Sequence, residues 1–135
     1  MCNIGDNECS IGFPITKKFL VIGNPIEHSL SPELHNYWIK NNGINAIYEK
    51  QKLNENDLKD IILQIRNNKI DGINVTVPYK KLVIPLLDEL TYEAEKTQSV
   101  NTIYLSVDKV IGHNTDISGF ETSMNKLNFD FKNNN

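Results

Sequence analysis

Apolar residues recur along the chain with two different spacings. Residues 19–22 form a continuous apolar run that ends at a Gly-Asn-Pro turn, a pattern typical of a strand buried on both faces. After Gly72 the spacing changes, because apolar residues at every second position alternate with Asn74 and Thr76. Such alternation indicates a strand with one apolar and one polar face. We therefore predict residues 73–77 as the central strand of a sheet, beside residues 19–22.

Helical spacing marks the segments between the predicted strands. Ser31 followed by Pro32 indicates a helix start, since serine caps free backbone amides and proline suits the first helical position. This helix is expected to end near Gly43. Similar patterns predict a strand at 46–52, helices at 57–66, 79–90 (broken or kinked at Pro85) and 91–98, a hairpin of 100–107 with 110–113, and a last helix from Thr115 or Asp116 toward Leu127.

This order of elements predicts the fold class. Strands that alternate with helices and then give way to a hairpin indicate an α/β fold, a three-layer domain with a mixed, mostly parallel central sheet flanked by helices. A chain of 135 residues is long enough for one such domain. We expect the domain to span residues 17–127, with a polar leader at 1–16 and a disordered tail at 128–135.

Composition excludes several classes of protein. The net charge of -3 gives no electrostatic reason to expect nucleic acid or an anionic membrane as a partner. No apolar run approaches the roughly 20 residues of a membrane helix, and the first residues lack the pattern of a secretory signal. Cys2 and Cys9 are expected to be free thiols of a cytoplasmic protein. A zinc site of Cys9 with His28 or His35 lacks a paired spacing, so no metal is predicted.

Polar side chains gather where the predicted central strand ends. Pro78 has no amide hydrogen to donate, so it stops the strand and leaves Lys80 just past its carboxyl end. Asn74, Thr76 and Lys80 can then converge at one edge of the sheet. In open α/β sheets ligands bind at that edge. The alternative is a surface strand with ordinary polar residues and a solvated lysine.

Three further groups of residues carry polar chemistry, and each has a structural alternative. Ser29 and Ser31 flank the start of a helix, whose free amides favour a carboxylate or phosphate, although capping and turn formation would also explain them. Asn101 stands at a strand start and is equally explained as a turn residue. Asp116 stands at a strand-to-helix corner, where capping is a sufficient explanation. Together with Lys80 these groups suit a small polyhydroxylated acid.

Four short motifs resemble one family in combination. Residues 23–32 (GNPIEHSLSP), 74–80 (NVTVPYK), 100–102 (VNT) and 114–116 (NTD) are similar, in this order, to the signatures of the amino-terminal substrate-binding domain of shikimate dehydrogenases. The resemblance runs from about residue 18 to about residue 127. One departure is Ile117, which stands where family members often carry glycine, although Gly119 is retained.

The resemblance implies roles for individual residues. Ser29 and Ser31 would hold the substrate carboxylate, and three residues would bind or order the groups around the ring hydroxyls: Asn74, Thr76 and Asn101. Lys80 and Asp116 would form the catalytic pair, which also contacts substrate. Such a pair suits the reduction of 3-dehydroshikimate to shikimate by NADPH, because hydride addition leaves negative charge on the carbonyl oxygen.

The resemblance also implies a cofactor that this sequence has no motif to bind. Family members bind NADP(H) on a second domain with a glycine-rich turn, and no G-x-G-x-x-G stretch occurs here. We therefore expect the chain to lack the cofactor domain, and to bind substrate without transferring hydride. The alternative is a stand-alone, non-catalytic module for shikimate- or quinate-like acids. Ser31, where quinate-preferring relatives can carry threonine, favours shikimate, and a homodimer stays open.

Overall fold

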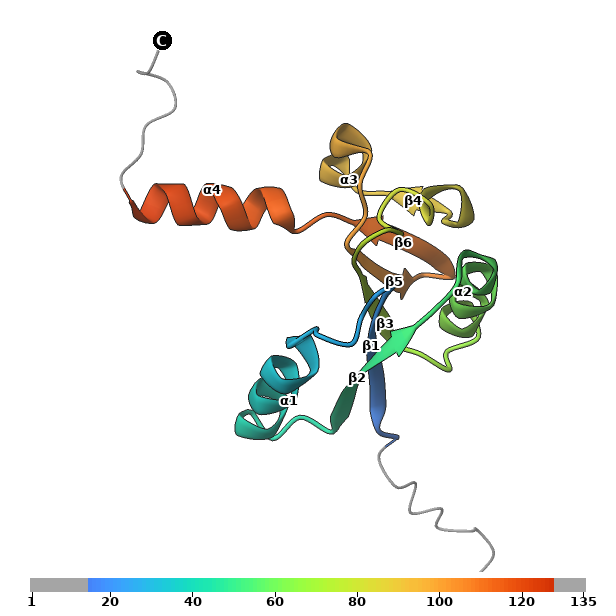
Figure 1. Ribbon diagram of the computed structural model, residues 1–135, viewed down its shortest axis with the longest axis horizontal. Helices are drawn as coiled ribbons and strands as arrows, with labels where there is room; N and C mark the ends of the chain where they lie inside the picture. Colours follow the sequence, from blue (N-terminus) through green and yellow to red (C-terminus); the bar gives the residue numbers. More distant parts are fainter. Residues whose placement is uncertain (1–14, 128–135) are drawn as a thin grey trace, which may run out of the picture.

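A six-stranded mixed sheet forms the centre of the computed structural model, which describes residues 15–127 (Figure 1). The strand order is β2-β1-β3-β5-β6-β4. Neighbouring strands are parallel in the pairs β1–β2, β1–β3 and β4–β6, and antiparallel in β3–β5 and β5–β6. The strands are β1 (Lys17–Gly23), β2 (Ala46–Lys52), β3 (Gly72–Val75), β4 (Glu89–Leu90), β5 (Thr102–Ser106) and β6 (Lys109–His113). The predicted α/β fold with a mixed, mostly parallel sheet is confirmed.

Helices lie on both faces of this sheet. On one face α1 packs against β2, and on the other face α2 and α3 cover the strands from β5 to β4 (Figure 1). The helices are α1 (Ser31–Asn41), α2 (Leu58–Arg66), α3 (Tyr92–Thr97) and α4 (Asp116–Lys126), with single 3-10 turns at η1 (Glu55–Asp57) and η2 (Ile84–Leu86). Because β1 lies between two strands, its consecutive apolar residues are buried on opposite faces. Leu20 and Ile22 join the larger core, and Val21 packs with Tyr48 on the α1 side.

The central position of β3, beside β1, is confirmed, but the strand is shorter than predicted. It ends at Val75 rather than at residue 77, and Val77 is exposed. The two strands still stay close past their ends, because the Thr76 amide donates to the Ile22 carbonyl (2.9 Å) and the Asn24 amide to the Val77 carbonyl (3.1 Å). The polar residues after β3 are therefore held against the turn that follows β1.

The predicted helix at 79–90 is wrong. The segment forms turns, with one 3-10 turn at Ile84–Leu86 and a short strand at Glu89–Leu90. Pro85 has no amide hydrogen to donate, which shortens any helix through it. Tertiary contacts hold the rest in place, since the Tyr79 hydroxyl donates to the Leu53 carbonyl (2.6 Å) and the Asp88 carboxylate accepts from the Val110 amide (2.7 Å).

The first helix, α1, packs only loosely against the sheet. Leu34 and Trp38 are 48% and 49% exposed, and no residue of α1 is fully buried. The helix is held to β2 mainly by Asn36, whose side-chain amide bonds both the amide (3.0 Å) and the carbonyl (2.7 Å) of Tyr48. Ile39 adds an apolar contact to the same small core.

Several expectations concern residues outside the described part. Cys2 and Cys9, most of the polar leader and the tail at 128–135 lie outside residues 15–127. None of the helices within this range combines the length and apolar character needed to cross a bilayer. Within the same range, His, Cys, Asp and Glu side chains form no group of three or more that could hold a metal ion.

Gly23 is required by the close approach of β1 to Thr76. A methyl group at this position would lie 2.6 Å from Thr76 Cγ2 and 3.0 Å from the Val77 carbonyl oxygen. We expect Gly23→Ala to lower the free energy of unfolding by about 1–3 kcal/mol, as overpacking does. Gly119→Ala is the control, because open space surrounds Gly119 within α4 and alanine favours a helix. Urea denaturation measures both, and equal changes would contradict the packing argument.

Candidate functional site

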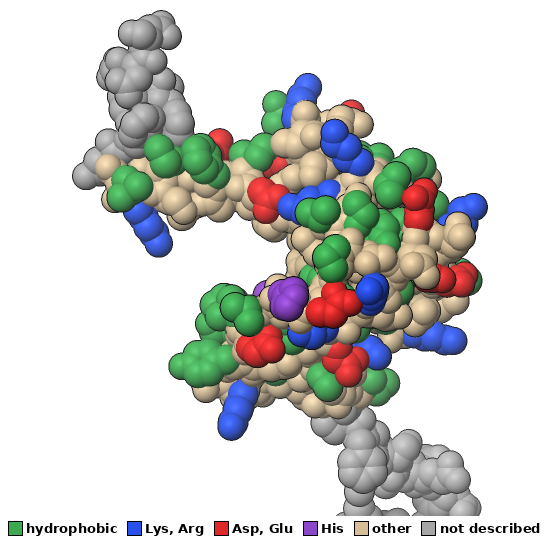
Figure 2. Space-filling model, viewed as in Figure 1, with side chains coloured by type: hydrophobic (Ala, Val, Ile, Leu, Met, Phe, Trp, Pro, Cys, Tyr) green, Lys and Arg blue, Asp and Glu red, His purple; other side chains and the backbone are tan. Residues whose placement is uncertain are grey.

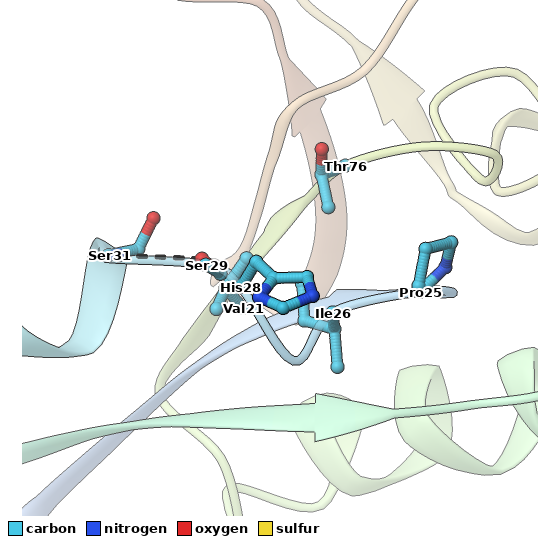
Figure 3. A pocket seen from close by; sticks show the side chains of 7 residues that line it. All are labelled: Val21, Pro25, Ile26, His28, Ser29, Ser31 and Thr76. Carbon is cyan, nitrogen blue, oxygen red and sulfur yellow. Dashed lines mark hydrogen bonds between the residues drawn. The ribbon is translucent and has the colours of Figure 1, made fainter.

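The polar residues singled out by sequence meet at one edge of the sheet. The carboxyl ends of β1 and β3 lie at this edge, as do the start of β5 and the end of β6. A pocket of about 280 Å³ opens there, lined by Val21, Pro25, Ile26, His28, Ser29, Ser31 and Thr76 (Figure 3). In the space-filling view the molecule is hollowed between α4 and the part that holds α1 (Figure 2). The arrangement can receive a small ligand from that side.

Ser29 and Ser31 form the end of the pocket at the start of α1. The Ser31 amide donates to Ser29 Oγ (3.3 Å), so this hydroxyl keeps its own proton for a ligand (Figure 3). The prediction that Ser31 caps α1 is wrong, because Leu30 holds the cap position and its side chain makes no capping hydrogen bond. Both serines are partly buried. Two hydroxyls beside the positive end of an 11-residue helix suit a carboxylate.

Tyr48 lies behind the two serines and was not predicted from sequence. Its ring is buried and stacks on His35 at 4.1 Å between centroids. Its hydroxyl donates to Asn74 Oδ1 (2.7 Å). Burial raises the pKa of Tyr48 to about 12, while a hydrogen bond with the Ser31 side chain lowers it. The hydroxyl therefore stays protonated at neutral pH and ties the serine end of the pocket to β3.

Asn74 continues this connection across the sheet. Its Nδ2 donates to Thr102 Oγ1 (3.2 Å) and to the Asn101 carbonyl (3.3 Å), and Thr102 Oγ1 donates to Asn101 Oδ1 (3.0 Å). Because both ends of the Asn74 amide are bonded within the protein, its side chain orders Asn101 more than it offers groups to a ligand. Thr76, by contrast, lines the pocket (Figure 3).

Lys80 and Asp116 form the opposite end of the site. Lys80 Nζ donates to Asp116 Oδ2 (2.8 Å), and Asn101 Nδ2 donates to Asp116 Oδ1 (2.9 Å). The predicted proximity of lysine and aspartate is confirmed. Asp116 does not cap α4, because Asn114 Oδ1 accepts from the Asp116 amide (2.8 Å) and leaves the carboxylate for Lys80. The catalytic role of the pair stays a prediction.

The electrostatics of this pair keep the carboxylate ionised. The hydrogen bond from Lys80 lowers the pKa of Asp116, and its positive charge and the bond from Asn101 act in the same direction against partial burial. An ammonium has three N–H donors, and one is given to Asp116. The others can bond an oxygen atom of a ligand.

The described residues offer no glycine-rich turn to a dinucleotide cofactor. Pyrophosphates bind at glycine-rich turns whose free amides face the phosphates. The turn between β1 and α1 carries Pro25 and Glu27 instead, and the Ile26 amide already donates to Glu27 Oε2 (2.9 Å). We assign no part of NADP(H) binding to residues 15–127.

Known proteins resemble this chain in both sequence and structure. The family model described as "Shikimate dehydrogenase substrate binding domain" matches residues 21–103. A shikimate dehydrogenase (NADP+) of Pelagibacter ubique is 60% identical over 117 residues, which are 87% of this chain and 44% of that protein.

Two solved structures share the fold. Shikimate 5-dehydrogenase of Listeria monocytogenes, in complex with shikimate and NAD, superposes with a TM-score of 0.80 at 31% identity, over 85% of this chain and 40% of that one. The enzyme of Thermus thermophilus, in complex with NADP(H) and shikimate, gives 0.76 at 29% identity, over 83% and 42%. The chain thus spans about two fifths of the length of these relatives. Because the family model covers most of the sheet and the serine turn, the chain belongs to the family of shikimate dehydrogenase substrate-binding domains.

Proposed function

We propose that this chain binds shikimate and 3-dehydroshikimate as the substrate-binding part of a shikimate dehydrogenase. One observation carries the proposal. A continuous series of hydrogen bonds joins the two ends of the site, running from Tyr48 through Asn74, Thr102 and Asn101 to Asp116 and Lys80. A site fixed at both ends suits a rigid ring with a carboxylate at one end and hydroxyl groups at the other.

The serine end is proposed to bind the carboxylate. Ser29 and Ser31 offer hydroxyl donors at the start of α1, where the helix dipole favours negative charge. Thr76 lines the same pocket and is proposed to bond a ring hydroxyl. Asn101 is proposed to bond or order the neighbouring ring hydroxyl, because two of its partners, Thr115 and Asp116, already fix its side chain.

The lysine end is proposed to carry the chemistry. NADPH, bound outside the described residues, would supply hydride to the carbonyl carbon of 3-dehydroshikimate. Lys80 would donate a hydrogen bond to the carbonyl oxygen and stabilise the negative charge that develops on it. Asp116 would hold the ammonium in place through the 2.8 Å contact. Lys80 would then transfer a proton to that oxygen, which completes the alcohol, and would regain a proton from water.

Removing both serine hydroxyls tests the serine end. We expect the double variant Ser29→Ala with Ser31→Ala to weaken shikimate binding by about 1–3 kcal/mol, because hydrogen bonds to a charged group are lost. Titration calorimetry of the 135-residue chain measures this change. Ser123→Ala, whose hydroxyl bonds Gly119 within α4, is the matched control. No saturable binding by the unaltered chain would refute the proposed function, and unchanged binding by the double variant would refute the serine assignment.

A further inference from the structure

Two lysines of β2 contact the turn that presents Ser29. Alternation along a strand places residues 48, 50 and 52 on the same face, so Lys50 and Lys52 continue the face that carries Tyr48. This face leads to the carboxyl edge of the sheet, because Lys52 pairs with Gly23, the last residue of β1. The lysines thus lie beside the turn at 24–30.

Their ammonium groups bond the turn at several acceptors. Lys50 Nζ donates to the Glu27 carbonyl (2.7 Å) and lies 3.5 Å from the Ser29 carbonyl. Lys52 Nζ donates to Glu27 Oε1 (2.9 Å), and Glu27 Oε2 accepts from the Ile26 amide (2.9 Å). The turn also closes on itself, since the Ser29 amide donates to the Ile26 carbonyl (3.0 Å). Every one of these bonds fixes the backbone on which the Ser29 hydroxyl stands.

These contacts also offset the negative charge of the turn. The Glu27 carboxylate and the carbonyl oxygens of Glu27 and Ser29 place negative charge within two residues of the Ser29 hydroxyl at the pocket. Such charge opposes a ligand carboxylate. Lys52 balances the Glu27 carboxylate, and Lys50 balances the carbonyl oxygens. The lysines therefore orient the turn and reverse its unfavourable charge.

We propose that Lys50 and Lys52 are positioning residues for the carboxylate of the ligand, setting the geometry and the charge of the turn that carries Ser29. This inference rests on the proposed function and deepens it. Neither lysine lines the pocket. Both act through Glu27 and the backbone of residues 26–29.

The test compares a charged ligand with a neutral one. Shikimate and its methyl ester are titrated into the unaltered 135-residue chain and into Lys50→Met and Lys52→Met. We expect each variant to bind shikimate on the order of 10-fold more weakly, since charge-assisted bonds are lost, and to bind the ester nearly unchanged. Lys18→Met is the control, because it removes the same charge and breaks the Lys18–Glu49 pair (3.1 Å) between β1 and β2, without a contact to the turn. Lys50→Arg should restore most of the shikimate affinity.

The outcomes separate this inference from the proposed function. Absence of saturable shikimate binding by the unaltered chain would overturn both. Two outcomes would overturn the positioning role alone, provided that the unaltered chain binds shikimate. In the first, the lysine variants lose equal affinity for the acid and the ester. In the second, neither lysine variant loses affinity for shikimate. Circular dichroism checks that each variant is folded.

A second measurement needs no ligand. Hydrogen bonds from Lys52 and from the backbone lower the pKa of Glu27 from 4.5 to about 2. In Lys52→Met the Glu27 carboxyl resonance should titrate closer to 4.5, and in Lys50→Met the Ser29 amide should exchange its hydrogen faster. An unaltered titration together with an unaltered exchange rate would overturn the proposal.

Discussion

Replacing Lys80 by alanine is expected to lower kcat by about 10²–10⁴-fold while KM changes much less. The measurement uses a chimaera in which residues 1–127 of this chain are joined to the remaining part of the 60% identical Pelagibacter ubique relative. Steady-state rates of NADPH oxidation with 3-dehydroshikimate give both constants.

Lys80→Ala is expected to change kcat more than KM because the negative charge that Lys80 stabilises develops on the carbonyl oxygen only during the reaction. The ground-state carbonyl oxygen carries little charge, whereas hydride addition places a full negative charge on it. Lys80 is partly buried and donates one N–H to Asp116. Its two other N–H donors are therefore oriented before the reaction begins. An alanine leaves no donor in this position.

Lys81→Ala provides the matched control, since the neighbouring lysine is exposed and the bond that its carbonyl accepts from the Ile84 amide (3.2 Å) is kept in the variant. Its kcat and KM should stay near those of the unaltered enzyme. If Lys80→Ala kept a near-normal kcat and only raised KM, Lys80 would be a binding residue, and its catalytic assignment would be wrong.

Replacing Asp116 by asparagine is expected to lower kcat by roughly 10–100-fold, the effect of losing a hydrogen bond between charged groups. Asparagine keeps the shape and the contact with Asn101, but it no longer balances the Lys80 ammonium or fixes its direction. Asp108→Asn is the control, because Asp108 lies in the β5–β6 turn with a positive φ of 64°, which asparagine tolerates. An equal loss of kcat in both variants would contradict the role of the pair.

The ionised Asp116 carboxylate also makes the stability of the fold depend on pH. The Lys80 hydrogen bond lowers the pKa of Asp116 in the folded protein below its usual value of 3.8. The stabilisation that the ionised carboxylate provides is therefore present above pH 3.8 and is lost as the pH falls through the lower folded value. Acid unfolding should show this contribution in the unaltered chain, and it should be absent in Asp116→Asn. Identical acid transitions for the two proteins would contradict the pair.

The strands β1 and β3 could be predicted because they carry strong local patterns. The apolar run of β1 and the alternation of β3 reflect burial on specific faces, and the structure places both strands at the centre of the sheet. The segment at 79–90 could not be predicted in this way. Its apolar spacing resembles a helix, but its conformation is set by distant partners such as Leu53 and Val110.

The candidate site shows the same division between local and distant signals. Most site residues stand at strand ends or helix starts, so their positions in sequence suggest where they meet. These residues are Ser29, Ser31, Thr76, Lys80, Asn101 and Asp116. Tyr48 stands inside β2, and only its position as a lone aromatic residue in a polar strand could have drawn attention to it. Its bond to Asn74 depends on the parallel packing of β2, β1 and β3, which no local pattern contains.

The crystal structure of this chain with bound shikimate tests the central claim most directly. We predict the carboxylate of shikimate between Ser29 and Ser31 at the start of α1, and the hydroxyl that becomes the carbonyl of 3-dehydroshikimate within hydrogen-bond distance of Lys80 Nζ. Shikimate bound in the reverse direction, with its carboxylate on Lys80, or bound away from these residues, would contradict the account.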